Sequence, residues 1–395
     1  MNEPFYPLAS TTWDDSEYEA LERVIRSGNF TMGTEVQKFE EQFAEQVGTQ
    51  YAIMTNSGSS ANLALLTAAR YMKNSNLADG DVVIAPAVSW STTYYPIHQA
   101  GLSISLVDIN LETLNIDVER VFEAITPRTK AIFTVNLLGN PSDLLQLKEI
   151  SEERNIQLFE DNCESLGASI GDKKAGTFGV GGTHSSFFSH HISTMEGGIT
   201  VTDDLALYEA MKSIRAHGWT RDLPRINSVH DKTGNDWDDL FRFVLPGYNL
   251  RPLEMEGALG QTQLLKLDKF IDQRRTNAKL LQDNSSRFPH VKLQKENDKS
   301  SWFGFSLLLT GPLKGKRTDL IHALDDAGIQ SRPIVSGNFA QNPVMKHLRH
   351  EKIPRLTNAE YLHNNGLFVG NHHYAMQPQI ARLVEVLERF EETNA

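Results

Sequence analysis

Two adjacent histidines, His190 and His191, lie near the middle of the chain in the run SSFFSHHISTMEGG, which spans residues 185–198. Small polar and aromatic residues open this run and Glu-Gly-Gly closes it, which is typical of a strand that enters a tight turn. Imidazole has an unperturbed pKa of about 6.5, so a histidine that faces a ligand can exchange a proton near neutral pH. The run therefore predicts a turn that carries two titratable rings.

Two other runs place polar residues where a predicted strand ends. In TNSGSSANLALL, Gly58 and Ser59 open a predicted helix, whose free N–H groups suit a phosphate; the alternative is an ordinary turn with a serine cap. In IQLFEDNCES, Asp161 and Glu164 follow an apolar run, where an aspartate can hold a protonated ring nitrogen; the alternative is a pair of loop or capping acids. Taken singly, neither run decides between ligand binding and a plain turn.

Aromatic and cationic residues occupy three more loops. Trp90 follows a predicted strand in PAVSWSTTYYP, where its ring can stack on a flat ligand; alternatively it is a core tryptophan. The runs RAHGWTRD and VLPGYNLRPLE combine arginine, histidine, tryptophan, tyrosine and asparagine around a glycine. Because arginine binds anions bidentately, these loops can hold an anionic sugar or a phosphate, or they are simply surface turns.

These residues need a scaffold, and the chain between them alternates short apolar runs with amphipathic stretches. Strands are predicted at YAIMTNS, DVVIAP, SISLVDI, KAIFTVN and IQLFED, with helices such as SSANLALLTAARYM, DVERVFEAI and DLLQLKEISEERN between them. This βαβ order predicts an α/β fold with a mostly parallel sheet flanked by helices. In such sheets ligands bind beyond the carboxyl ends of the strands.

The pattern changes near Arg251. A long helical stretch is predicted over residues 251–283, followed by fewer strands and by the helices RTDLIHALDDAG and QPQIARLVEVLERFEE. We therefore predict a large domain at residues 1–264, which would bind any cofactor, and a smaller C-terminal α+β domain at residues 265–395.

Composition narrows the class of protein. The 395 residues are 40% hydrophobic and 22% charged, as is typical of soluble globular proteins, and the net charge of −12 argues against broad nucleic-acid or anionic-membrane surfaces. The only cysteine, Cys163, excludes an internal disulfide framework and a cysteine-rich metal or iron–sulfur site within this chain, and favours a cytoplasmic location. We expect neither a signal peptide nor a membrane helix.

The order and spacing of these runs resemble the sugar aminotransferase family of fold type I pyridoxal-phosphate enzymes. The resemblance extends from about Pro7 to the C-terminal region, and it implies pyridoxal 5'-phosphate or pyridoxamine 5'-phosphate as the cofactor. At the SSFFSHH run the family usually has a lysine, which anchors the cofactor covalently and moves protons at its reactive carbon. Here His190 occupies the lysine position, and Met195 replaces a glycine before Glu196.

Histidine can perform only the second of these two functions, because imidazole moves protons but does not tether the cofactor. Within the family, runs such as EDNCES, SHHISTMEGG and VLPGYNLRPLE resemble a branch of nucleotide-sugar dehydratases. The resemblance implies a lyase that removes the 3-hydroxyl of a GDP-linked 4-keto-6-deoxy sugar, with L-glutamate as amino donor, in deoxysugar (colitose) biosynthesis for lipopolysaccharide. A related histidine-bearing branch uses an iron–sulfur cluster, for which Cys163 alone supplies too few thiolates.

The resemblance also implies roles for individual residues. Asp161 would hold the ring nitrogen of the cofactor and Trp90 would stack on the ring. Glu164, where the family often has glutamine, would lie near the ring hydroxyl. The phosphate would be contacted by Gly58, Ser59, Ser185 and Ser189. His190 would move the proton at the reactive carbon and could then protonate the departing hydroxyl.

The remaining roles concern a neighbouring subunit and the substrate. Asn249 would reach the phosphate of the cofactor in a neighbouring subunit, so the resemblance implies a homodimer with shared active sites. His217, Arg221 and Arg251 would contact the sugar or the diphosphate. We expect His191 to be structural, because adjacent residues of a strand face opposite ways. No metal site is expected.

Two other functions stay open from the sequence. A nucleotide-sugar aminotransferase that tolerates histidine would release an amino sugar, whereas a dehydratase would release a deoxy sugar and ammonia. A pseudoenzyme that has lost the lysine and does no chemistry would show no change in the absorbance of its cofactor when glutamate is added.

Overall fold

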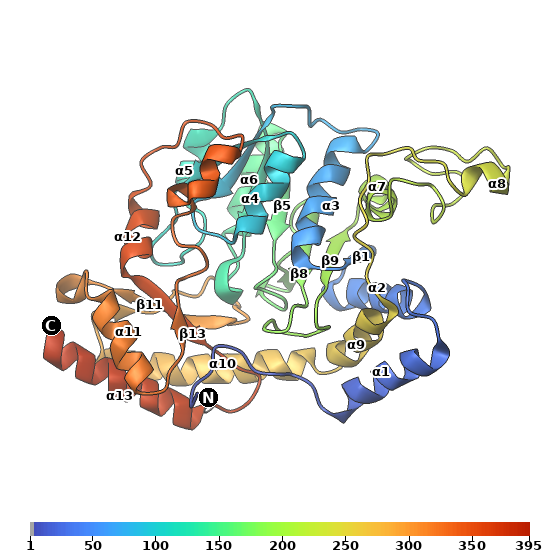
Figure 1. The fold of residues 1–395 in the computed structure, drawn as a ribbon. Coiled ribbons are helices and arrows are strands. Elements are labelled where there is room, and N and C mark those ends of the chain that lie inside the picture. The colour runs from blue at the N-terminus through green and yellow to red at the C-terminus, as the bar shows by residue number, and fades with distance from the viewer. Residues whose placement is uncertain (1–3) are drawn as a thin grey trace.

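The computed structural model describes residues 4–395 and is built around a seven-stranded sheet (Figure 1). In spatial order its strands are β1 (Tyr51–Thr55), β9 (Gly198–Thr202), β8 (Gly181–Ser185), β5 (Gln157–Asp161), β4 (Thr129–Val135), β2 (Val82–Pro86) and β3 (Ser103–Val107). Strand β9 runs antiparallel to both neighbours, and the other neighbouring pairs are parallel. The predicted α/β fold with a mostly parallel sheet is confirmed. The first three residues of the predicted large domain lie outside the described residues.

Helices cover both faces of this sheet. One face packs against α3 (Gly58–Tyr71), α4 (Ser91–Gln99) and α7 (Leu205–Arg215), and the other against α5 (Val118–Ala124) and α6 (Leu144–Arg154). Side chains alternate along each strand, so Val83 and Phe133 belong to the first apolar layer and Ile84 and Ile132 to the second. Helix α2 (Thr34–Val47) covers the edge at β1.

The predicted helical stretch over residues 251–283 consists of two helices, α9 (Glu254–Leu264) and α10 (Leu267–Asp283). At the break between them, the Lys266 Nζ lies 2.8 Å from carboxylate oxygens of both Asp14 and Glu17. These two acids stand at the start of α1 (Asp15–Ser27), which packs against α9. The predicted helical stretch is therefore interrupted at Leu265 and Lys266.

The C-terminal part of the chain forms a second, antiparallel sheet with its own apolar cluster. Its strands, in spatial order, are β10 (Val291–Lys292), β11 (Gly304–Leu309), β13 (Gly366–Gly370) and β12 (Ser331–Arg332). The cluster beside it includes residues of α10, α11 (Arg317–Asp326) and α13 (Gln377–Asn394).

The chain crosses between the two units more than once. Tyr6, near the N-terminus, is buried in the cluster of the small sheet. Helix α12 (Thr357–Asn365) instead places Leu362 in the core of the large sheet. The boundary at residues 264 and 265 therefore stays a prediction.

Three smaller elements complete the fold. Strands β6 (Ser169–Ile170) and β7 (Lys173–Lys174) pair as a two-stranded hairpin. Between α7 and α9, an arm at residues 220–247 extends away from the body and carries the short helix α8 (Asp236–Asp239) (Figure 1). Across the described residues, no helix combines the length and apolar character that crossing a membrane requires.

Candidate active site

A cavity of about 500 Å³ opens where β2, β4, β5 and β8 reach their carboxyl ends. This is the edge at which parallel α/β sheets bind ligands. Its wall contains eight residues that the sequence singled out: Gly58, Ser59, Trp90, Asp161, Glu164, Ser185, Ser189 and His190. They come from segments far apart in the sequence, so the fold brings them together, while their individual roles stay predictions.

The turn at Gly58 brings a serine against the first turn of α3. A side-chain Cβ at Gly58 would lie 2.8 Å from the Ser185 Cβ and 3.1 Å from the Cys163 Sγ, so a larger residue does not fit. Ser57 caps the helix by accepting the Ser60 N–H at 3.1 Å. The first N–H groups of α3 therefore line the cavity beside the Ser185 hydroxyl, which suits a phosphate.

Asp161, the last residue of β5, is a buried carboxylate with neutral partners. Its Oδ2 accepts hydrogen bonds from the Asn62 Nδ2 and the Thr93 Oγ1, both at 2.8 Å, and its Oδ1 accepts the Cys163 N–H at 3.2 Å. Within residues 4–395, no lysine, arginine or histidine forms an ion pair with it. Because a buried charge needs a countercharge, this carboxylate fits the protonated ring nitrogen of a pyridoxal cofactor.

Trp90 lies at the mouth of the cavity, directly before α4. Its side chain is 58% exposed, so the alternative of a core tryptophan is wrong. An exposed indole on a cavity wall offers a face on which a flat ring can stack. The stacking role remains a prediction.

Glu164 follows β5 on the same wall. Burial, together with the nearby Asp161 carboxylate, raises the pKa of Glu164 to about 7, although the Leu138 N–H and the Arg332 charge act in the opposite direction. The Leu138 N–H donates to the Glu164 Oε2 at 2.9 Å. Near neutral pH this carboxyl group therefore exchanges between its two protonation states.

His190 lies in the loop after β8, because that strand already ends at Ser185. The turn that carries both histidines therefore begins directly after Ser185. The His190 N–H donates to the Phe187 carbonyl at 2.9 Å, which bends the chain toward the cavity. The imidazole lies beside the Phe303 ring, with 5.2 Å between the ring centroids.

Electrostatics keep the His190 ring neutral. Burial, followed by the positive charge of Arg332, lowers the pKa of His190 to about 3, although the hydrogen bond with Phe187 opposes this. The Nδ1 of His190 is buried and has no hydrogen-bond partner among residues 4–395. A neutral ring with an unused nitrogen can accept a proton from a ligand.

His191 faces away from this chemistry. It is 1% exposed, and its Nε2 donates to the Ser301 carbonyl at 3.1 Å. It therefore has a structural contact, as we expected. The strand argument behind that expectation does not hold, since both histidines lie in a loop.

Met195, where the resemblance implies a glycine, has a backbone conformation typical of glycine. Its φ is +73°, in the left-handed region that side chains disfavour. The Met195 carbonyl accepts the Phe188 N–H at 3.1 Å. The loop between β8 and β9 thus keeps its tight turn despite the substitution.

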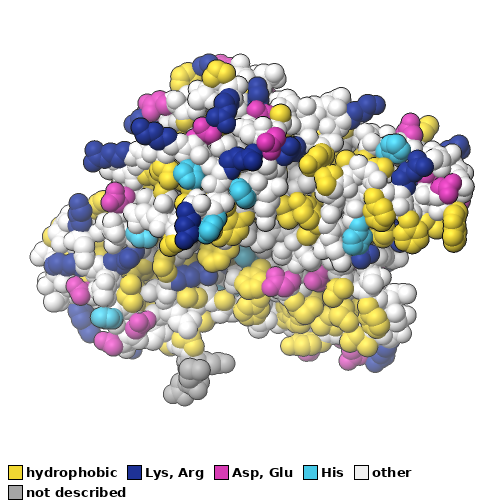
Figure 2. All heavy atoms as spheres, turned by 45° about the horizontal axis from the view of Figure 1, so that its top comes forward, with side chains coloured by type: hydrophobic (Ala, Val, Ile, Leu, Met, Phe, Trp, Pro, Cys, Tyr) yellow, Lys and Arg dark blue, Asp and Glu magenta, His cyan; other side chains and the backbone are white. Residues whose placement is uncertain are grey.

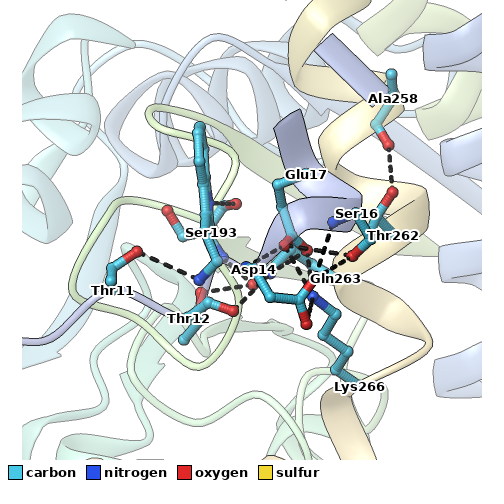
Figure 3. Close-up of polar contacts among 11 residues, drawn as sticks. Thr11, Thr12, Asp14, Ser16, Glu17, Ser193, Ala258, Thr262, Gln263 and Lys266 are labelled. Carbon is cyan, nitrogen blue, oxygen red and sulfur yellow. Dashed lines mark hydrogen bonds and ion pairs between the residues drawn. The ribbon is translucent and has the colours of Figure 1, made fainter. Parts of the chain in front are cut away.

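A buried polar network ties this loop to the helices beneath it (Figure 3). The Gln263 Oε1 on α9 accepts the Ser193 N–H at 3.0 Å and the Thr12 hydroxyl at 2.7 Å. The Gln263 Nε2 donates to the Glu17 Oε1 at 2.7 Å, and Lys266 neutralises that carboxylate. Since Ser193 is three residues from His190, the network fixes the base of the loop.

Three of the four other predicted contacts line a second hollow of about 290 Å³, outside the cavity. Its lining includes Asn249, Arg221, Arg251 and Trp219. The Arg221 guanidinium lies 4.0 Å from the Trp219 ring centroid and that of Arg251 lies 5.9 Å from it. The Arg251 Nε donates to the Asn249 Oδ1 at 3.0 Å, and His217 packs edge-on against Trp219. These four predicted residues form one cationic and aromatic group that is separate from the cavity.

Several functional candidates escaped the sequence reasoning. Asn62 and Thr93 hold Asp161, Phe303 packs against His190, and Arg332 lines the cavity. Asn62 lies one helical turn after the Ser-Gly-Ser run, and that position was a usable signal. Arg332 lies in the short strand β12, about 140 residues after His190, and nothing local in the sequence connects the two.

The chain matches known proteins over nearly its whole length. The sequence profile of the DegT/DnrJ/EryC1/StrS aminotransferase family matches residues 11–388. A GDP-4-keto-6-deoxy-D-mannose 3-dehydratase from Escherichia coli O55:H7 is 51% identical over 385 residues, which cover 97% of this chain and 99% of that protein. One from Yersinia pseudotuberculosis is 49% identical over 386 residues, which cover 97% of this chain and 98% of that protein.

Solved structures agree with these sequence matches. The E. coli GDP-4-keto-6-deoxy-D-mannose-3-dehydratase with bound hydrated PLP superposes with a TM-score of 0.95 at 51% identity, covering 98% of this chain and 100% of that one. The same kind of enzyme with a trapped PLP-glutamate geminal diamine gives a TM-score of 0.94 at 51% identity, covering 97% of this chain and 100% of that one. Two more distant aminotransferases, at 22% and 23% identity and each with a TM-score of 0.86, share the fold.

Proposed function

This chain belongs to the DegT/DnrJ/EryC1/StrS aminotransferase family, and from that membership we propose that it is a pyridoxal-phosphate-dependent dehydratase. Its substrate is GDP-4-keto-6-deoxy-D-mannose, from which it removes the 3-hydroxyl, and L-glutamate is its amino donor. The substrate assignment rests on relatives of this name that are 49% and 51% identical over 97% of this chain. The product is a precursor of a dideoxy sugar such as colitose in lipopolysaccharide.

One observation supports dehydration over amino transfer. Among residues 4–395, none of those that line the cavity is a lysine, and His190 lies on the wall where the family has its anchoring lysine. Without a lysine the cofactor is held by non-covalent contacts, and the imidazole retains only the proton-transfer function. A bound sugar that no lysine amine displaces stays in place long enough to lose its hydroxyl.

The residues of the cavity fit the cofactor. When bound, pyridoxal phosphate supplies an electron sink for bond cleavage next to its ring. Asp161 would keep the ring nitrogen protonated, since its buried carboxylate has only neutral partners. The α3 N-terminus at Gly58, with the Ser185 hydroxyl beside it, would hold the phosphate, and Trp90 would cover one face of the ring.

His190 moves the protons. With the cofactor bound, its neutral imidazole would accept a proton at the carbon next to the ring and would then donate one to the departing 3-hydroxyl, which would leave as water. The aromatic neighbours Phe187 and Phe303 orient the imidazole and limit the access of solvent. L-Glutamate supplies the amino group and leaves as 2-oxoglutarate. Hydrolysis releases the deoxy sugar and ammonia.

Product analysis tests the proposal. The protein is incubated with pyridoxal phosphate, L-glutamate and GDP-4-keto-6-deoxymannose, and the nucleotide sugar is identified by mass. We expect a sugar that is one oxygen atom lighter, together with free ammonia. An amino sugar would instead identify an aminotransferase, and an unchanged sugar would contradict both assignments.

Reduction with borohydride tests the lysine-free site directly. Borohydride converts a cofactor bound to a lysine amine into a stable covalent adduct. Since no lysine among the described residues lines the cavity, we expect the cofactor to be removed by denaturation after the treatment. Intact-protein mass spectrometry would reveal a cofactor adduct on any lysine, and such an adduct would contradict the proposed role of His190.

We also propose that the functional unit is a homodimer with shared active sites, located in the cytoplasm. Large apolar side chains are exposed on the arm at residues 220–247, including Trp237 at 81% and Phe241 at 66%, and Figure 2 shows hydrophobic side chains gathered there. Such exposure is typical of an interaction surface. A second copy would bring Asn249 and its neighbouring arginines to the cavity that a single copy leaves separate.

The cytoplasmic location rests on the free thiol of Cys163.

A further inference from the structure

A positive charge is buried near the loop that carries His190, and it has no ionic partner. Arg274, on α10, is 3% exposed. Within residues 4–395, no carboxylate oxygen lies within the 4.0 Å of an ion pair with its guanidinium, whereas the next residue, Arg275, reaches Asp272. Burial lowers the pKa of Arg274 from 12.5 to about 10, although the nearby Tyr374 acts in the opposite direction. An unpaired buried charge costs free energy, so packing alone does not explain this residue.

The Arg274 guanidinium donates to main-chain carbonyl groups instead of to a carboxylate. Its Nη1 donates to the Phe303 carbonyl at 3.1 Å and to the Asn371 carbonyl. Phe303 directly precedes β11, and Asn371 directly follows β13. The Asn371 side-chain amide donates in return to the Arg274 carbonyl at 3.0 Å and to the Trp302 carbonyl at 2.9 Å. Helix α10 is therefore joined to the end of the small sheet at which Phe303 lines the cavity.

The main chain of Phe303 is also held from the side of the large sheet. Its N–H donates to the Leu138 carbonyl, in the loop after β4, at 3.0 Å. The preceding residue, Trp302, has a φ of +49°, in the left-handed region that side chains disfavour. A backbone conformation of this kind persists where the surrounding contacts enforce it. The Arg274 and Leu138 contacts therefore fix the place from which the Phe303 side chain projects.

The Phe303 side chain in turn sets the place of the proposed base. Its ring centroid lies 5.2 Å from that of His190 and 5.9 Å from that of His191. The Nδ1 of His190 has no hydrogen-bond partner within residues 4–395, so aromatic packing contributes to the orientation of the imidazole. A displacement of about 1 Å at a reacting group can reduce a rate about a hundredfold. A shift of Phe303 would therefore impair the proton transfer.

The charge of Arg274 also acts on the two imidazoles. Burial is the largest cause of the low pKa of His190, and the charges of Arg332 and Arg274 lower it further. Burial and then the Arg274 charge lower the pKa of His191. Arg332 lies in the cavity wall, where solvent reaches it, whereas Arg274 is enclosed by protein. Solvent therefore screens the Arg274 charge less than that of Arg332.

We propose that Arg274 is a positioning residue for the proton transfer: it fixes the Phe303 ring against His190 and adds a constant positive charge close to the imidazole. This inference rests on the proposed function. Arg274 does not line the cavity, so it acts through Phe303 and His190. It should therefore affect the rate constants of the reaction and leave the binding of cofactor, glutamate and nucleotide sugar nearly unchanged.

Rapid mixing of the cofactor-loaded protein with L-glutamate tests the inference, with cofactor absorbance as the signal. Arg274→Met removes the charge and both hydrogen bonds, so the rate constant at saturation should fall by about tenfold or more. The half-saturating glutamate concentration and the affinity for the cofactor should stay within about twofold of the wild type. Arg274→Lys keeps the charge but loses the forked geometry, so it should recover part of the rate.

Arg275→Met is the matched control. Arg275 follows on the same helix and also donates to main-chain carbonyl groups, to Ser300 at 2.9 Å and to Gly167 at 3.3 Å, but not to Phe303. It should lose stability in urea unfolding, yet keep its rate constant within about twofold of the wild type. An equal loss of rate in both methionine variants would indicate a general loss of stability and would overturn the inference.

A double-mutant cycle with Phe303→Leu tests the route of the effect. If Arg274 acts through the Phe303 ring, Arg274→Met should change the rate constant much less in the Phe303→Leu background than in the wild type. If Arg274→Met does not fold, the same cycle is measured with Arg274→Lys. Equal effects in both backgrounds, wild-type rate constants in the Arg274 variants, or a loss confined to the half-saturating concentrations would each overturn the inference.

A failure of the proposed function is distinguishable from these outcomes. A wild-type chain whose cofactor does not respond to glutamate would contradict the proposed function and the inference with it. The outcomes described above would overturn the role of Arg274 alone.

Discussion

At the scale of single residues, the chemistry of the site depends on His190, which places an imidazole where a lysine would place an amine. The imidazole of His190 lies against Phe303, and burial with the Arg332 charge holds its pKa at about 3. A lysine at this position would tether the cofactor and later displace the bound sugar. A histidine at this position can transfer protons but cannot tether the cofactor. The aminotransferase fold therefore supports elimination of the sugar hydroxyl in place of amino transfer.

Replacing His190 by asparagine tests this separation of functions. The amide has similar size and polarity but does not accept a proton near neutral pH, so we expect dehydration to fall by at least about a hundredfold. Cofactor binding should persist, because the phosphate and ring contacts come from other residues. Product formation is measured by mass, and cofactor content by absorbance after gel filtration. Turnover at the wild-type rate would show that another group moves the proton.

Glu164 gives a pH-dependent prediction. Burial raises its pKa from 4.5 to about 7 in the folded state. Between these values the folded chain keeps a proton that the unfolded chain has lost, so the free energy of unfolding falls as the pH rises through this window. Glu164→Gln keeps the acceptor for the Leu138 N–H and cannot titrate.

We therefore expect Glu164→Gln to be more stable than the wild type at pH 8 by about 1–3 kcal/mol and equally stable near pH 4. Urea denaturation of the cofactor-free proteins at the two pH values measures the difference. A constant difference across the whole range would indicate a packing effect rather than the titration of this carboxyl group.

At the scale of helices and strands, the sequence predicts the large sheet well and the small one poorly. Most strands of the large sheet are apolar runs such as VVIAP, whose burial on both faces leaves a clear signal, whereas β8 reads GGTHS. Strand β13 reads GLFVG, and glycine at both ends weakens any strand signal. Helix α12, with the polar sequence TNAEYLHNN, carries little apolar periodicity.

The residues of the site also divide into those that the sequence predicts and those that it does not. Asp161 is identified by its position at the end of an apolar strand, and His190 by the run SSFFSHH, in which it takes the lysine position of the family. The partners of Asp161 are not, since Asn62 and Thr93 lie 99 and 68 residues away from it. Contacts over such separations arise from the packing of α3 and α4 on the sheet, and local spacing does not encode them.

The link between α9 and the catalytic loop is a prediction at this scale. Gln263→Met keeps the side-chain volume but removes the hydrogen bonds to Ser193, Thr12 and Glu17. Because these partners are buried and lose their pairing, we expect the free energy of unfolding to fall by about 2–4 kcal/mol. Denaturant unfolding measures the change.

The matched control is Gln37→Met on α2. Gln37 is exposed, and its side chain contacts Glu41 of the same helix, so a change within about 0.5 kcal/mol is expected. If the two variants were equally stable, the network in Figure 3 would contribute nothing to holding the loop.

At the scale of the whole molecule, the predicted residues fall into two groups that one copy does not unite. The cavity holds His190 with the predicted cofactor contacts, whereas Asn249 lies in the separate hollow with Arg221 and Arg251. The exposed apolar arm lies between α7 and α9, and the hollow is lined from the same stretch of chain. A symmetric dimer that buries the arm would bring the hollow of each copy to the cavity of the other.

Subunit mixing tests whether the sites are shared. His190→Asn removes the base, and Asn249→Asp places a negative charge where the phosphate of the other subunit's cofactor would lie, so each variant alone should be nearly inactive. If each site takes His190 from one copy and Asn249 from the other, a mixed dimer contains one site with both native residues. After unfolding and refolding an equal mixture, half of the dimers are mixed, so about a quarter of the wild-type activity should return. Refolding each variant alone provides the control. Activity that stays at the level of the separate variants would show that each subunit contains a complete site.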